Sequence, residues 1–103
     1  MIEDIFENIK RMERQIPTMK YGEFRKLVKE INDLLGVDFI MLVKGLGRNR
    51  NFYISIKRES DLDIELVITE LWHTPEEFKL EIKTPSGTKA WRVPFKFMEE
   101  VSV

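Results

Sequence analysis

The stretch from Val37 to Lys57 decides the predicted fold. It reads 37-VDFIMLVK-44, then 45-GLGRNR-50, then 51-NFYISIK-57. Two apolar runs with an alternating pattern flank a connection rich in glycine and arginine, and this arrangement is typical of a β-hairpin. We therefore predict two paired strands on either side of the connection. In the first strand, Phe39, Met41 and Val43 are expected to face the core.

Three further alternating runs follow, separated by turn residues at 59–61, 73–77 and 86–87. All five predicted strands can place their apolar side chains on one common face. The pairs expected across the later turns are Ile56 with Ile64, Ile54 with Leu66, Ile68 with Ile82, Trp72 with Phe78, Ile82 with Trp91, and Leu80 with Val93. Because a slip of one residue would invert every side chain, this agreement predicts an antiparallel five-stranded meander.

Two helices are predicted before the sheet. Apolar residues recur at helical spacing near the N-terminus and again from Tyr21 to Leu35. Pro17 separates the two patterns, and Gly36 fits the left-handed position that ends a helix. We predict one α+β domain over residues 1–103, of order α-α-β-β-β-β-β, with both helices packed on the apolar sheet face. Residues 97–101 fit either a turn or a short helix.

The composition is that of a globular chain, with 43% hydrophobic and 34% charged residues. No apolar run approaches the length of a membrane span, and the acidic, amphipathic start MIEDIFENIK is unlike a signal peptide. The absence of cysteine excludes disulfides and thiolate chemistry. We expect a cytoplasmic protein, and the heavy use of charged residues favours a thermophilic source.

The net charge is only −1, but charge is distributed unevenly along the chain. Residues 37–58 carry five basic side chains and one acidic one. Residues 59–81 carry one basic and eight acidic side chains, and residues 82–98 carry four basic side chains and no acid. If the sheet curls strongly, the two basic segments approach each other and form one positive surface. If the sheet stays flat, they lie at opposite edges.

The basic segments also contain aromatic residues, and this combination suits single-stranded nucleic acid. Cationic side chains bind phosphates, while aromatic rings stack on bases and contribute roughly 1–3 kcal/mol for each base. The residues predicted to bind nucleic acid are Lys44, Arg48, Arg50, Tyr53, Lys57, Trp91 and Arg92. The alternative is a solvated turn in which Trp91 belongs to the core.

The face of the predicted sheet that points away from the helices carries an apolar stripe. Its predicted members are Ile40, Leu42, Tyr53, Val67 and Leu71. Scattered apolar residues are common on solvated faces, but a cluster of this size also fits an interaction surface. The stripe therefore predicts a protein-interaction or homodimerisation surface as an alternative to nucleic-acid binding.

Evidence for catalysis is weaker. The carboxylates Asp61, Asp63 and Glu65 alternate along one strand, which could begin a metal site, and the segment 81-EIK-83 resembles a short element of metal-dependent nucleases. His73 is the only histidine, and no serine or cysteine is visibly paired with it. Gly45 and Gly47 lack the Gly-Lys-Ser/Thr ending of a phosphate loop.

The leading hypothesis is a non-enzymatic protein that binds single-stranded DNA or RNA with little sequence preference. We expect no cofactor, no metal and no membrane association. The first alternative is a protein-interaction or homodimerisation module, and the second is a metal-dependent nuclease.

Overall fold

The computed structural model describes residues 1–46, 53–58 and 63–101, with Tyr53 and Arg58 described by their backbone only. Four helices and a four-stranded antiparallel sheet make up this part of the chain. The elements are α1 (Ile2–Gln15), α2 (Tyr21–Leu35), α3 (Phe39–Leu46), β1 (Tyr53–Arg58), β2 (Ile64–Glu70), β3 (Glu77–Thr84), β4 (Gly87–Pro94) and α4 (Lys96–Val101). The strands are neighbours in chain order, as in a meander.

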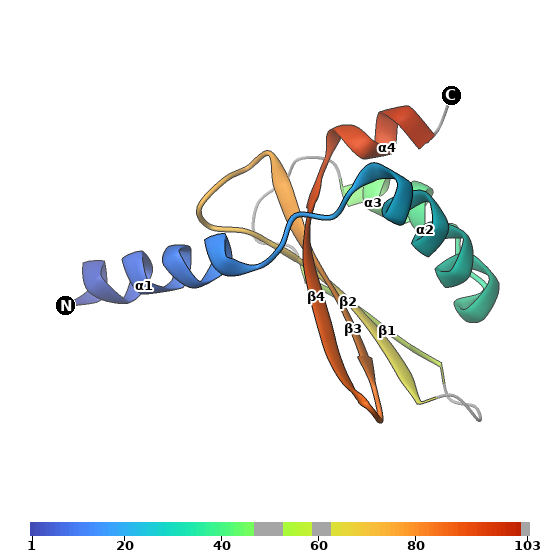
Figure 1. The fold of residues 1–103 in the computed structure, drawn as a ribbon, viewed down its shortest axis with the longest axis horizontal. Coiled ribbons are helices and arrows are strands. Elements are labelled where there is room, and N and C mark those ends of the chain that lie inside the picture. The colour runs from blue at the N-terminus through green and yellow to red at the C-terminus, as the bar shows by residue number, and fades with distance from the viewer. Residues whose placement is uncertain (47–52, 59–62, 102–103) are drawn as a thin grey trace.

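The core lies between one face of the sheet and the three helices α2, α3 and α4 (Figure 1). Each element contributes large apolar side chains that are buried. They are Phe24, Val28 and Ile31 from α2, Phe39 and Val43 from α3, Leu66 and Ile68 from β2, Phe78 and Leu80 from β3, Val93 from β4, and Phe97 and Met98 from α4. Among the described residues, none of the helices combines the length and the apolar composition that a membrane span requires.

The prediction of five strands is wrong, because the first predicted strand is the helix α3. The side chains that α3 buries are Phe39, Ile40 and Val43, a helical spacing, while Met41 is exposed. The run is apolar almost throughout, so it contains no strict alternation to separate strand from helix. The Oδ1 atom of Asp38 accepts a hydrogen bond from the Met41 amide at 3.2 Å and so caps the N-terminal end of α3.

The predicted core face of the other strands is confirmed except at Trp72, which lies beyond the end of β2 and is 41% exposed. The register of these strands is shifted by two residues. Ile56 pairs with Leu66 instead of Ile64, and Leu80 pairs with Trp91 instead of Val93. Because side chains alternate with a period of two, a slip of two residues keeps every side chain on its face. The apolar pattern therefore determines which face of the sheet each side chain points to. The length of each turn determines which residue of the neighbouring strand it is paired with.

Several local predictions are confirmed. α1 ends at Gln15, and Ile16, the residue before Pro17, has extended backbone angles. Gly36 is left-handed, with a φ angle of 65°, and ends α2. The strand β4 contains Pro94, which cannot donate to a neighbouring strand and therefore predicts an edge position, and β4 does lie at an edge of the sheet. Of the two alternatives for residues 97–101, the structure shows the helix α4.

The prediction that both N-terminal helices pack on the sheet is wrong for α1. Figure 1 shows α1 extending away from the sheet and from the other three helices, with the N-terminus at its far end. The molecule is accordingly elongated, with extents of 43 × 34 × 22 Å. Its radius of gyration is 14.1 Å, whereas a compact chain of this length has about 13 Å. A projecting amphipathic helix is therefore the main departure from a compact domain.

Candidate interaction site

The projecting helix α1 exposes a row of large apolar side chains. The exposed fractions are 68% for Ile2, 59% for Ile5, 39% for Phe6 and 64% for Met12. Trp72, in the connection between β2 and β3, is 41% exposed, and its ring lies 4.9 Å from the ring of Phe6. These five side chains, which we call the α1 surface, form an apolar area beside the sheet.

α1 needs contacts beyond its own hydrogen bonds to be stable. An isolated helix of fewer than about 12–15 residues is marginal in water, and α1 has 14 residues. Most helical stability in proteins comes from packing of the apolar face. The first turn of α1 leaves that face to solvent, because Ile2 and Ile5 are both exposed. The α1 surface is thus an apolar helix face that lacks cover in the single chain.

A buried carboxylate attaches the C-terminal end of α1 to the sheet. Glu13 is the one buried charged residue among the described residues. Its oxygens accept hydrogen bonds from the backbone amide of Trp72 at 2.9 Å and from that of His73 at 2.8 Å. The ring atom Nδ1 of His73 lies 3.0 Å from Oε1 of Glu13. One side chain therefore joins α1 to the β2–β3 connection.

The surroundings of Glu13 favour its charged form. Burial alone would raise the pKa of this carboxyl group, since desolvation penalises the charge. The hydrogen bonds from Trp72 and His73, together with the electrostatic attraction of His73, outweigh that effect. The pKa of Glu13 is therefore lower than that of an ordinary glutamate. An ionised Glu13 is the form that holds α1 in place.

Arg92 on β4 holds the segment that connects α1 and α2. Its Nε donates to the carbonyl oxygen of Ile16 at 2.8 Å, and its backbone amide donates to that of Pro17 at 2.9 Å. The amide of Met19 in turn donates to the Arg92 carbonyl oxygen at 2.8 Å. The segment therefore runs along the edge of β4 and fixes the direction in which α1 leaves the sheet.

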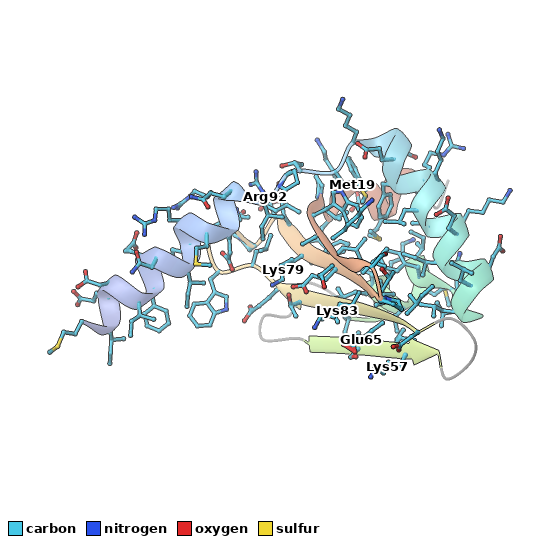
Figure 2. All side chains as sticks on the ribbon, turned by 60° about the horizontal axis from the view of Figure 1, so that its bottom comes forward. Met19, Lys57, Glu65, Lys79, Lys83 and Arg92 are labelled. Atoms are coloured by element: carbon cyan, nitrogen blue, oxygen red, sulfur yellow. The ribbon has the colours of Figure 1, made fainter. Side chains whose placement is uncertain are left out.

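Charged residues follow one another across the outer face of the sheet, the face opposite the core. Figure 2 shows the labelled members running from Lys57 and Glu65 through Lys83 and Lys79 to Arg92. The ion pairs are Lys57–Glu65 at 3.9 Å, Lys83–Glu65 at 3.9 Å, Lys79–Glu81 at 2.7 Å and Arg92–Glu77 at 3.2 Å. Acidic and basic groups alternate, so these described cations lie among carboxylates instead of forming a positive surface.

The residues predicted to bind nucleic acid do not share one surface. Lys57 and Arg92 lie on the outer sheet face and are ion-paired, as described above. Trp91 lies on the opposite face, where it is half-buried against the core, and Lys44 is exposed on α3. Arg48 and Arg50 are outside the described residues, and so is the side chain of Tyr53. The described cations of the two basic segments meet only across a carboxylate, since Lys57 and Lys83 each lie 3.9 Å from Glu65, and they do not merge into one positive surface.

The predicted apolar stripe on the outer sheet face is not observed. Ile40 and Leu42 belong to α3, where Ile40 is in the core and Leu42 packs against it. Val67 does point to the outer face but is only 3% exposed, and Leu71 just after β2 is 1% exposed. Two of its predicted members, Ile40 and Leu42, were placed on a strand that is in fact the helix α3, so they are not on the outer sheet face.

A groove lies between α2 and the hairpin of β3 and β4. One cavity of about 430 Å³ is lined by the apolar residues Leu27, Ile82 and Trp91. Its polar lining residues are Thr84, Ser86, Thr88 and Lys89. A second cavity of about 200 Å³ continues beneath α2, and both are lined by Leu27, Ile82 and Thr84. The groove offers a mainly apolar lining to a ligand or segment.

The residues considered for metal-dependent catalysis do not form a described metal site. Glu81 is opposite Val67 and pairs with Lys79, and Asp61 is outside the described residues. Among residues 1–46, 53–58 and 63–101, no group of three His, Asp or Glu side chains is placed to hold a metal ion. The geometry therefore gives the nuclease hypothesis no additional support.

Sequence reasoning did not identify the α1 surface, because it assigned the apolar face of α1 to the core and treated His73 as a turn residue. One signal was available. Glu13 occupies the same helix face as Ile9 and Ile16, and a single carboxylate on an apolar face needs a partner when buried. That partner could not be named from the sequence, because Trp72 and His73 lie about sixty positions further along the chain.

Comparison with protein-family models, curated proteins and solved structures found no match.

Proposed function

We propose that this chain is a non-enzymatic interaction module that associates with a second copy of itself through the α1 surface. The observation that carries the proposal is the set of large apolar side chains on α1, which are 39–68% exposed. Exposed apolar surface of this kind marks interaction sites. A symmetric homodimer is the commonest way in which identical chains cover such a surface.

The attachment of α1 supports the same function. Glu13 and Arg92 bind the C-terminal end of α1 and the segment after it through several hydrogen bonds. The helix is therefore held in one direction while its N-terminal turns project from the sheet (Figure 1). Such preorganisation lowers the entropic cost of association.

The area available on one short helix is small. Stable interfaces bury about 800 Å² on each partner, and smaller ones are typical of weak, reversible complexes. We therefore expect a dissociation constant in the micromolar range. Analytical ultracentrifugation over a wide concentration range measures it directly, and the wild-type chain should change from monomer to dimer as the concentration rises.

The variant Ile5→Glu places a charge within the α1 surface and should weaken dimerisation at least tenfold. Met41→Glu is the matched control, because Met41 is also a large exposed apolar residue, on α3 and away from α1. That control should dimerise like the wild type. A wild-type chain that stays monomeric at the highest concentrations would contradict the proposal, as would equal effects of the two substitutions.

Binding of single-stranded nucleic acid stays a prediction from the sequence. The two arginines on which it depends most, Arg48 and Arg50, lie outside the described residues, and Lys44 is exposed on α3. Fluorescence anisotropy with labelled oligonucleotides at low salt tests this prediction. Absence of binding, or binding unchanged in the double variant Arg48→Ala/Arg50→Ala, would reject it.

A further inference from the structure

We infer that the two α1 helices of the dimer pair in antiparallel orientation, with the rest of each chain at opposite ends of the helix pair. This inference rests on the proposed self-association and specifies its geometry. It follows from the spacing of apolar residues on α1, from the order of its charges and from the end at which α1 is attached.

The apolar residues of α1 follow the heptad spacing of a helix pair. Ile2, Ile5, Ile9 and Met12 alternate in steps of three and four, like the a and d positions of a coiled coil. Between antiparallel helices, an a position of one packs beside a d position of the other. A two-fold axis near residue 7 then brings Ile2 beside Met12 of the second copy and Ile5 beside its Ile9.

The charges on α1 favour the same orientation. Glu3, Asp4 and Glu7 lie in its N-terminal half, whereas Lys10, Arg11 and Arg14 lie in its C-terminal half. These six residues lie at the outer positions of the heptad, away from the apolar seam, so they act across the pair only at long range. Antiparallel pairing places the acidic half of one helix alongside the basic half of the other, and it also opposes the two helix dipoles. Complementary charges of this kind select orientation more than they add affinity.

The attachment of α1 gives a steric reason. The sheet and the other helices all lie toward the C-terminal end of α1 (Figure 1). Packed helices are about 8–10 Å apart, whereas the smallest extent of the molecule is 22 Å. Parallel pairing would bring two such bodies together at one end of the pair. Antiparallel pairing places them at opposite ends, where they do not compete for space.

Disulfide trapping tests the orientation cleanly, because the chain contains no cysteine. The experiment uses the full chain in two single variants, Ile2→Cys and Met12→Cys, each oxidised alone and as a mixture. In the antiparallel pair, position 2 of one chain lies about 15 Å along the helix axis from position 2 of the other, because ten residues at a rise of 1.5 Å separate positions 2 and 12. The same offset separates the two positions 12. A disulfide requires Cα atoms within about 7 Å.

We expect each variant alone to stay largely uncrosslinked, and the mixture to give a heterodimer in which mass spectrometry identifies a disulfide between positions 2 and 12. Strong crosslinking of each variant with itself would show parallel pairing and overturn the inference while leaving the proposed dimer intact. Absence of any dimer in ultracentrifugation would instead remove the proposed function.

An alternative binding site for α1 of one copy is the groove between α2 and the β3–β4 hairpin of the second copy. Leu27→Lys changes the lining of that groove and does not alter α1. Under the antiparallel pairing, this variant should dimerise within about twofold of the wild type. Loss of the dimer in Leu27→Lys, with no crosslink between positions 2 and 12 in the mixture of the two cysteine variants, would place α1 in the groove and overturn the inference.

Discussion

At the residue scale, the Glu13 carboxylate determines whether α1 stays attached to the sheet. It accepts backbone hydrogen bonds from Trp72 and His73 and also contacts the His73 ring. These partners lie about sixty residues away in sequence, so one polar side chain adds a long-range attachment to the limited apolar packing of α1, such as the contact between Phe6 and Trp72. The stability of α1 therefore depends on a polar contact, and polar contacts can be changed without changing shape.

The substitution Glu13→Gln keeps the size of the side chain and removes its charge. Hydrogen bonds to a charged group contribute roughly 1.5–3 kcal/mol, so the free energy of unfolding should fall by about 2 kcal/mol. Urea denaturation followed by circular dichroism measures this loss. Glu7→Gln, at an exposed position of the same helix, is the control and should change the unfolding free energy by less than about 0.5 kcal/mol.

The lowered pKa of Glu13 predicts a definite dependence on pH. In the folded chain this carboxyl group releases its proton at a lower pH than in the unfolded chain, so its contribution is complete above the unfolded value of about 4.3. The contribution is lost as the pH falls through the lowered folded value. The difference in stability between wild type and Glu13→Gln should therefore be present at neutral pH and vanish in acid. A difference that grows in acid would contradict the lowered pKa.

At the element scale, two side chains cap the start of α3. The run from Phe39 to Val43 is apolar enough for either structure, and the neighbouring Gly36 already ends α2. The Asp38 side chain accepts a hydrogen bond from the amide of Met41, while Asn32 Oδ1 accepts one from the amide of Phe39 at 2.8 Å. Two side chains thus satisfy amides at the start of α3 that a strand would have paired with a neighbour.

Replacement of Asp38 by alanine should destabilise the domain by about 1 kcal/mol, because the capping hydrogen bond is lost. Asp33→Ala, at an exposed position inside α2, is the control and should have little effect. Chemical denaturation of both variants under identical conditions measures the difference. Equal stabilities would show that the Asp38 cap does not stabilise α3.

At the scale of the whole molecule, the projection of α1 links folding to association. A partner that binds only the folded chain raises its stability by mass action. If the α1 surface is covered by a second copy, the melting temperature should rise with protein concentration. Calorimetry between about 5 and about 500 µM should show an increase of a few degrees. Ile5→Glu should abolish this dependence, whereas Met41→Glu should retain it.

Part of this architecture could be predicted from particular residues. Pro17 and Gly36 marked the ends of two helices, and Ile54, Leu66, Ile68 and Leu80 marked the core face of three strands. The register could not be predicted, since an alternating pattern looks the same after a slip of two residues. The candidate site could not be predicted either, because an amphipathic helix has the same sequence pattern whether a sheet or a second chain covers it.

The sequence by itself determined where α1 and α2 end and which side of each strand is apolar, because these depend on local backbone preferences and on periodicity. Only the tertiary structure decided that residues 39–46 form a helix, that Arg92 and Lys57 lie among carboxylates, and that α1 projects with Ile2, Ile5 and Met12 exposed. Those outcomes depend on contacts between residues far apart in the chain, and an amino-acid pattern does not contain the distances between them.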